Sequence, residues 1–190
     1  GVVSITAARK GAKVSAIDLT PELLERARQN GQLAQVDVDW REGDVENLPF
    51  EDGSFDAVLS QFGHIFAPRP AVAIGEMLRV LKPGGTIAFS TWPPEFFIGR
   101  MFILGARYMP PPPPGVSPPT QWGDRAVVQE RLGAAVRDIA FENGTMLGPA
   151  LSPQHHRALM ERTAGPIIKM VEMLTTSDPA RLATFRSEYD

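Results

Sequence analysis

The chain has 190 residues, of which 43% are hydrophobic and 22% charged, a composition typical of a globular protein with a buried core. It contains no cysteine, which excludes disulfides, cysteine-ligated metal sites and cysteine nucleophiles. The formal net charge of −3 argues against a nucleic-acid-binding surface.

Helical and strand-like patterns alternate through the first half of the sequence. In chain order they predict a helix over 2–9, a strand over 13–18, a helix over 20–31, strands over 36–40 and 55–60, a helix over 71–81 and a strand over 85–91. Short connections rich in glycine and proline separate these elements. Because strands that alternate with helices form parallel sheets covered by helices, we predict an α/β fold.

Proline marks the start of the second half. Nine of the 18 prolines lie between Pro93 and Pro119, and the run 110–114 favours stiff polyproline II, as in a spacer or surface loop. Beyond this region, the pattern predicts helices over 96–108 and 124–134, a strand over 136–142 and three helices from Pro153 onward. We therefore predict one domain overall, made of a core over 1–92, a Pro-rich cap insertion over 93–135, and the rest of the core with C-terminal helices over 136–190.

Nothing in the sequence indicates a membrane segment. The apolar stretch over 96–109 is interrupted by Arg100 and Arg107 and is too short to span a bilayer. No charged leader precedes an apolar stretch either, and we expect a cytoplasmic protein.

Ligands of an open parallel sheet bind beyond the carboxyl ends of its strands, so the residues directly after each strand are candidates. Asp18 can accept hydrogen bonds from both hydroxyls of a ribose, or serve only the turn before Thr20. Asp44 can accept a hydrogen bond from an exocyclic amino group such as that of adenine, or belong to a solvated acidic loop. His64 can act as a general base, or be a structural histidine.

Four stretches together resemble class I S-adenosylmethionine-dependent methyltransferases, in the small-molecule group related to quinone-biosynthesis methyltransferases. They are AIDLTPELL at 16–24, EGDVENLPF at 42–50, SFDAV at 54–58 and MLRVLKPGG at 77–85. Each stretch alone is not specific, but their combination, order and spacing are specific for this family, and the resemblance covers roughly residues 1–92. The resemblance implies a Rossmann-like sheet flanked by helices, S-adenosyl-L-methionine as the cofactor, and methyl transfer to a small-molecule acceptor.

The resemblance also implies roles for single residues at the adenosine end of the cofactor. Asp18 would bind the ribose hydroxyls, and Leu19 would pack on the adenine. Asp44 would meet the adenine amino group, with Gly43 and the Val45 backbone beside the ring.

At the methionine end, Ser60 would lie close through its main chain, and Gly1 would be the last glycine of the family's glycine-rich loop. The first strand of the family and the rest of that loop are absent from the sequence. We therefore expect the two neighbours of that central strand each to lack a partner, which is costly for buried backbone groups. We also expect the late hairpin strand to be missing, a longer natural protein of about 250 residues, and poor cofactor binding by these 190 residues alone.

Methyl transfer from a sulfonium is an in-line displacement, in which the protein aligns donor and acceptor and excludes water. His64 is the candidate base if the acceptor must lose a proton. The apolar side chains over 96–108 favour a small, partly apolar acceptor covered by the segment 96–122, or they simply cover the sheet. No metal is predicted.

Two alternatives remain at this level. One is a catalytically inactive methyltransferase-like binding domain, which the absent glycine loop favours. The other is an NAD-dependent oxidoreductase, because Asp18 would also suit the ribose of a nicotinamide cofactor. The 43–50 loop and the 82–85 turn argue against the oxidoreductase.

Overall fold

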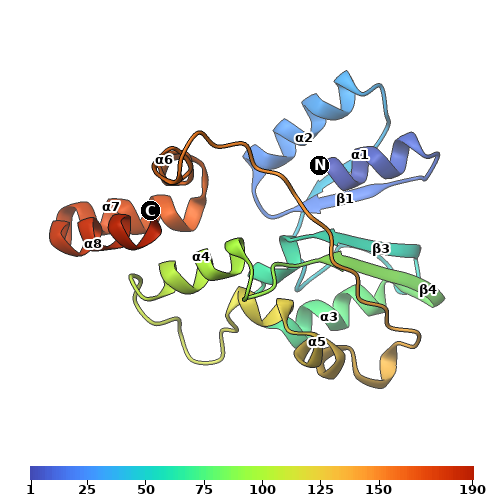
Figure 1. The fold of residues 1–190 in the computed structure, drawn as a ribbon. Coiled ribbons are helices and arrows are strands. Elements are labelled where there is room, and N and C mark those ends of the chain that lie inside the picture. Colours follow the sequence, from blue (N-terminus) through green and yellow to red (C-terminus); the bar gives the residue numbers. More distant parts are fainter. The chain divides into compact units, whose positions relative to one another are not determined.

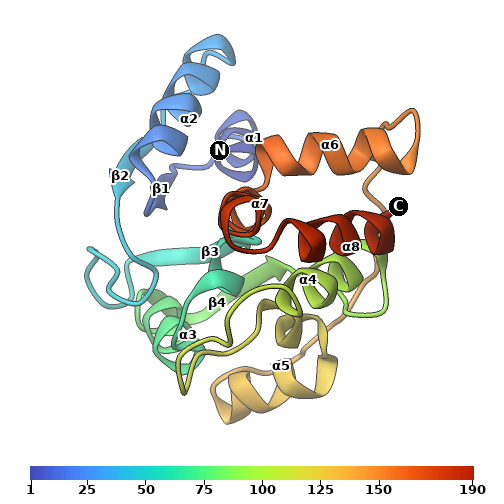
Figure 2. The ribbon, with the colours of Figure 1, turned by 90° about the vertical axis from the view of Figure 1, so that its left-hand side faces the viewer.

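The computed structural model describes all 190 residues and divides them into two compact units. Unit 1 comprises residues 1–91, 115–118 and 126–137, and unit 2 comprises residues 92–114, 119–125 and 138–190. Figures 1 and 2 show the helices and strands of both units from two directions.

Unit 1 alternates helices with strands, as the sequence predicted. Its elements are α1 (Val2–Arg9), β1 (Ser15–Asp18), α2 (Pro21–Leu33), β2 (Asp39–Glu42), β3 (Phe55–Gln61), the 3-10 helix η1 (Gly63–Phe66), α3 (Pro70–Arg79), β4 (Leu81–Ser90), most of α5 (Arg125–Leu132) and the 3-10 helix η3 (Gly133–Ala135). β1 pairs with β2 and β3 with β4, both in parallel. The α/β class is therefore confirmed.

The four strands form two separate two-stranded sheets, and no strand lies between β1 and β3 (Figure 1). The expectation that the neighbours of the absent strand each lack a partner is thus confirmed. α1 contacts both α2 and β3. Leu59, on β3, stays 48% exposed. β1 and β3 are consequently edge strands with unpaired backbone groups.

One apolar cluster joins α3 to the β3–β4 sheet and to the loop after β2. Its buried members are Leu48, Met77 and Val80, and the partly buried side chains around them are Ile17, Val45, Phe50, Phe55, Val58, Ile87 and Phe89. α3 contributes because its buried residues Ala73, Ile74 and Met77 recur at helical spacing on one face. This packing places the 43–50 loop against α3.

Two boundaries in unit 1 differ from the predicted ones. α2 continues to Leu33, past Gly31, where the sequence predicted its end. Gly31 is buried in this helix, and a Cβ there would be in ordinary van der Waals contact with Trp40 at 3.5 Å. β4 begins at Leu81 and absorbs the predicted 82–85 turn as an irregularity in its pairing with β3. Gly84, with φ of +78°, permits this bend.

Unit 2 is helical and contains α4 (Phe97–Ala106), the 3-10 helix η2 (Pro119–Gly123), α6 (Pro153–Thr163), α7 (Gly165–Ser177) and α8 (Pro179–Tyr189). Its core consists of Tyr108, Ile167, Met170, Leu174, Leu182 and Phe185. The helix over 96–108 and the three helices after Pro153 are confirmed. None of the helices in the chain combines the length and apolarity needed to cross a membrane.

The predicted strand over 136–142 is wrong, because these residues form no regular secondary structure. The segment has the apolar and β-branched residues of a strand, but no other strand pairs with it. An extended segment gains little without a partner for its backbone groups.

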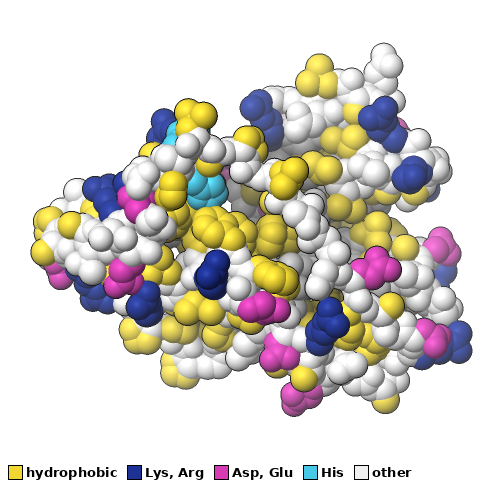
Figure 3. Space-filling view, viewed as in Figure 1, with side chains coloured by type: hydrophobic (Ala, Val, Ile, Leu, Met, Phe, Trp, Pro, Cys, Tyr) yellow, Lys and Arg dark blue, Asp and Glu magenta, His cyan; other side chains and the backbone are white.

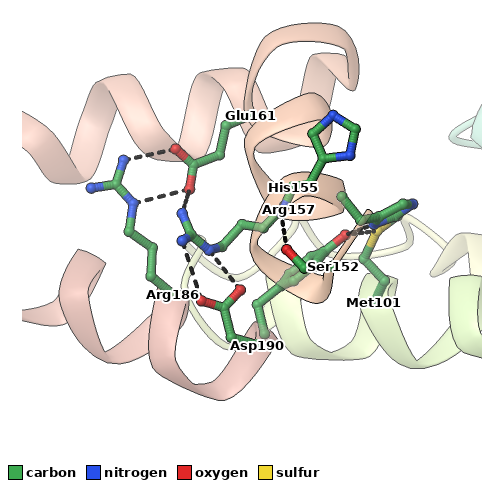
Figure 4. A network of polar contacts seen from close by, with 9 residues as sticks. Met101, Ser152, His155, Arg157, Glu161, Arg186 and Asp190 are labelled. Carbon is green, nitrogen blue, oxygen red and sulfur yellow. Dashed lines mark hydrogen bonds and ion pairs between the residues drawn. The ribbon is translucent and has the colours of Figure 1, made fainter. Parts of the chain in front are cut away.

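A polar network ties α6 to α8 (Figure 4). Glu161 accepts hydrogen bonds from Arg157 Nη1 at 3.0 Å and from Arg186 Nη2 at 2.7 Å. Arg157 Nε also donates to Asp190 Oδ1 at 2.9 Å. The hydrogen bonds from Arg186 and Arg157 lower the pKa of Glu161. Both signs of charge also lie on the visible surface of these helices (Figure 3).

Candidate functional site

The carboxyl ends of β1 and β2 bring two predicted binding residues to the same edge of one sheet. Asp18 is the last residue of β1 and lies opposite Glu42 of β2 in register. The next residue, Gly43, donates its N–H to the Asp18 carbonyl oxygen at 3.1 Å. Asp44 follows directly, so the two aspartates come after neighbouring strands.

Each of these aspartates uses only one carboxylate oxygen within the chain. Asp18 Oδ1 accepts the N–H of Thr20 at 3.0 Å, and Asp44 Oδ1 accepts the N–H of Glu46 at 2.9 Å. Such bonds to the backbone two residues on are the turn chemistry of aspartate. They hold the side chains in place and leave Oδ2 of each carboxylate available to a ligand. Turn formation and ligand binding are therefore compatible roles for these residues.

Apolar surface accompanies the two carboxylates. Leu19 is 65% exposed beside Asp18, which leaves its side chain available to a ring. Val45 is half-buried against the cluster of Leu48. A Cβ on Gly43 would lie 3.5 Å from Pro49 and 3.6 Å from Ile17, which is ordinary van der Waals contact.

Arg79, at the end of α3, holds the far half of the 43–50 loop. Its guanidinium donates to the carbonyl oxygens of Phe50 at 2.8 Å and Leu48 at 3.0 Å. It also pairs with Glu76 and Asp52, each at 2.7 Å. Glu76 Oε2 in turn accepts the N–H of Leu48 at 2.7 Å, and the Arg79 and Leu48 bonds lower the pKa of Glu76.

Sequence reasoning missed this contribution of α3. The spacing of Glu76 and Arg79 at i and i+3 indicates an ion pair on one helix face. That spacing carries no information on the loop carbonyls that Arg79 contacts, because those lie 29 and 31 residues away in the chain.

Ser60 and His64 contact each other at the carboxyl end of β3. Ser60 Oγ and His64 Nδ1 lie within hydrogen-bond distance at 2.9 Å, and the backbone N–H of His64 donates to the same hydroxyl at 3.3 Å. The chain turns back between them at Phe62, whose φ of +64° is unusual for a bulky residue. The His64 ring also packs on Phe89, with centroids 4.6 Å apart.

His64 is only 1% exposed. Burial, and to a smaller extent the positive charge of Arg131, lowers the pKa of His64 to about 4. The imidazole is therefore neutral at pH 7. It is also a weaker base than a histidine in water, whose pKa is about 6.5.

This depressed pKa makes a prediction about acid stability. Unfolded His64 binds a proton near pH 6.5, whereas the folded protein does not until about pH 4. The free energy of unfolding should fall as the pH drops through this window, by up to about 3 kcal/mol. Urea unfolding at pH 7 and pH 4.5 measures the loss. We expect His64→Gln to reduce it and His155→Gln, which changes an exposed histidine, to preserve it. Equal losses in wild type and His64→Gln would contradict the assignment.

A shallow groove of about 230 Å³ runs along β3 and β4 where they meet α1. Its lining residues are Val3, Leu59, Ser60, Gln61, Ala88, Phe89 and Ser90. Ser60 is thus the one predicted site residue in this groove. Gly1, at the start of α1, lies against α2 instead, where a Cβ would be 3.0 Å from that of Ala27.

Unit 2 contains a separate hollow of about 280 Å³. It is lined by Pro93, Pro94, Glu95, Gly123, Asp124, Arg125 and Asn143. Arg125 Nη2 donates to Asn143 Oδ1 at 3.2 Å, and the guanidinium lies over the ring of Phe141. The hollow offers both signs of charge, and none of the predicted site residues lines it.

Comparison with known proteins places these features in a family. Residues 1–89 match the methyltransferase domain family. The chain is 38% identical over 189 residues to an uncharacterized protein of Mycobacterium tuberculosis H37Rv. The aligned region covers 99% of this chain and 69% of that protein. It is 41% identical over 112 residues to the ubiquinone biosynthesis O-methyltransferase of Xanthomonas oryzae pv. oryzae, covering 57% of this chain and 46% of that enzyme.

Among solved structures, a Bacillus halodurans C-125 protein described as a methyltransferase resembles this chain with a TM-score of 0.51 at 26% identity. The likeness covers 64% of this chain and 51% of that one. The chain therefore spans more of the mycobacterial protein than of the Xanthomonas enzyme or the Bacillus structure. The matched range 1–89 includes β1, β2 and β3, and with them all the predicted site residues.

Proposed function

Because the chain belongs to the class I S-adenosylmethionine-dependent methyltransferases, we propose that it transfers the methyl group of this cofactor to a small-molecule acceptor by in-line displacement. The observation that carries the proposal is the pair of aspartates after neighbouring strands, each with Oδ2 available. A nucleoside presents hydroxyl and amino donors that suit two such carboxylates.

Asp18 Oδ2 would accept the ribose hydroxyls, and Asp44 Oδ2 would accept the adenine amino group. The exposed Leu19 and the Val45 backbone would flank the ring, and Gly43 lies between the two carboxylates along the chain. When bound, the cofactor supplies a methyl group on a positively charged sulfur. The protein has to align the sulfur with the acceptor and exclude water.

Ser60 and Gly1 are proposed for the methionine end of the cofactor. The hydroxyl of Ser60 is held by His64 through both the ring nitrogen and the backbone N–H. This leaves the Ser60 main chain as the group to meet the cofactor. Gly1, at the amino end of α1, offers a backbone that approaches α2 closely.

His64 as a general base stays a prediction. The neutral ring can accept a proton, but its lowered pKa limits it to acceptors that lose their proton easily. Unchanged turnover in His64→Ala would assign the histidine to a structural role, since His64 packs between Ser60 and Phe89.

The acceptor is proposed to be small and partly apolar. Phe96 and Phe97, at the start of α4, are 53% and 50% exposed, and Ile103 further along α4 is 47% exposed. Exposed aromatic and aliphatic side chains on one helix favour an apolar ligand. The O-methyltransferase of Xanthomonas acts in ubiquinone biosynthesis, and an apolar acceptor for this chain agrees with that relative.

Cofactor binding tests the proposal through Asp18. Asp18→Asn keeps an oxygen for the Thr20 N–H and removes the charge that would meet the ribose. We expect it to weaken binding of S-adenosylmethionine in titration calorimetry by about 10- to 100-fold, as for loss of charge-assisted hydrogen bonds.

Asp37→Asn is the matched control for this experiment, because Asp37 is an exposed acidic residue that precedes β2, whereas Asp18 and Asp44 lie at or just after the carboxyl ends of their strands. It should bind like the wild-type chain. Equal affinities of Asp18→Asn and Asp37→Asn would contradict the ribose-binding role.

A second candidate is a methyltransferase-like domain without activity. Cofactor binding without methyl transfer to any acceptor from a panel of small phenols, amines and carboxylates would favour this candidate. Turnover with one of them would exclude it.

A further inference from the structure

Glu46 is the only buried acidic residue in the chain, with a side chain 5% exposed. Burying a carboxylate is costly unless hydrogen bonds and a charge compensate it. The bonds that it makes therefore indicate what it is for.

Both oxygens of the Glu46 carboxylate bind the residue that precedes α3. Oε1 accepts the backbone N–H of Arg69 at 2.5 Å, and Oε2 accepts Arg69 Nε at 2.7 Å. The Arg69 side chain itself is 68% exposed. Because the amino end of a helix carries partial positive charge, the position also favours a carboxylate. Glu46 is thus attached to the start of α3.

The backbone of Glu46 contacts Asp44. Its N–H donates to Asp44 Oδ1 at 2.9 Å, which fixes the rotation of that carboxylate and directs which oxygen remains available. Two residues later, Leu48 is held at the other end of α3 by Glu76 and Arg79. The segment that follows Asp44 is therefore anchored at both ends of α3.

We propose that Glu46 is a positioning residue for recognition of the adenine amino group. By binding the start of α3, it holds its own N–H where that group orients Asp44 and leaves Asp44 Oδ2 for the ligand. The inference rests on the proposed function, because it presumes that Asp44 meets adenine.

A ligand pair distinguishes positioning from simple stabilisation. S-adenosylhomocysteine presents an amino donor at position 6 of the purine, whereas its inosine analogue presents a carbonyl oxygen that a carboxylate repels. An oriented Asp44 should prefer the adenosine ligand by about tenfold or more. General loosening of the fold weakens both ligands alike and leaves their ratio unchanged.

The test is the ratio of the two dissociation constants, measured by calorimetry for wild type, Glu46→Ala and Glu46→Gln. We expect Glu46→Ala to lose most of the preference, a change of about tenfold in the ratio. Glu46→Gln keeps an oxygen for the Arg69 N–H and should restore part of it. Arg69→Ala, which keeps that backbone bond, should stay close to wild type.

Glu51→Gln is the matched control, because Glu51 is an exposed acidic residue following the same loop. It should preserve the ratio. An unchanged ratio in Glu46→Ala, with wild type still preferring the adenosine ligand, would overturn the positioning role. If wild type binds neither ligand, or binds both equally, the proposed function fails at Asp44 and the inference fails with it.

Discussion

Replacing Gly99 with alanine is expected to lower the free energy of unfolding by about 3 kcal/mol, at the upper end of what overpacking costs. Gly99 is buried in α4 against the Pro93–Pro94 segment. A Cβ there would lie 2.1 Å from the Pro93 carbonyl oxygen and 2.6 Å from the Pro94 Cα. Both atoms belong to the backbone, so the helix or the segment has to move. Gly123 meets Pro93 as closely, with 2.5 Å to its Cα.

Gly105 provides a control in the same helix. No atom lies within 4 Å of the position of its Cβ, and alanine favours helix over glycine. Gly105→Ala should therefore raise the free energy of unfolding by up to about 1 kcal/mol. Urea denaturation of both variants, followed by circular dichroism, measures the difference. Equal stabilities of the two variants would show that the Pro93 contact does not constrain α4.

The second large effect is expected for Arg79→Ala, which should lower the free energy of unfolding by clearly more than the loss of an exposed ion pair does. The Arg79 side chain is 30% exposed and donates to two loop carbonyls as well as to Glu76. Its removal leaves the Glu76 carboxylate, 19% exposed, without its cation. Arg79→Lys should recover little, because an ammonium cannot reproduce the fork of a guanidinium.

Lys82→Ala is the control for this prediction. Lys82 pairs with Asp56 at 2.8 Å, but the two side chains are 46% and 89% exposed. Exposed pairs contribute about 0 to 1 kcal/mol, so this variant should unfold close to wild type. Hydrogen exchange of the Leu48 amide reports the local effect, since that N–H is bonded to Glu76. Slow exchange of this amide in Arg79→Ala would contradict the role of Arg79 in holding the loop.

These predictions assign α3 a function beyond covering a sheet. Glu46 binds Arg69, directly before the first turn of α3, and the last turn holds Leu48, so the two ends of one helix anchor the loop that carries Asp44. The 77–85 stretch that contributed to the resemblance includes Arg79. The structure thus gives a physical reason why this stretch and the 42–50 stretch occur in one chain.

The sequence by itself determined the elements whose signals are local. Turn residues, helical periodicity and apolar runs predicted α1, β3, α4 and the three C-terminal helices, because these signals come from neighbouring residues. The same local logic placed Asp18, Asp44 and Ser60 at strand ends, since the end of a strand can be read from its own residues. The binding and catalytic roles of these residues stay predictions.

Only the tertiary structure decided the features that need a distant partner. α2 runs through Gly31, which is buried beside Trp40 of β2, while the 136–142 segment stays irregular because no strand pairs with it. The burial of Glu46 likewise depends on Arg69, 23 residues away, which turns an acidic loop residue into an anchor. The physical reason is the same in each case: packing and hydrogen bonding across the fold outweigh the small free-energy preferences that single residues express locally.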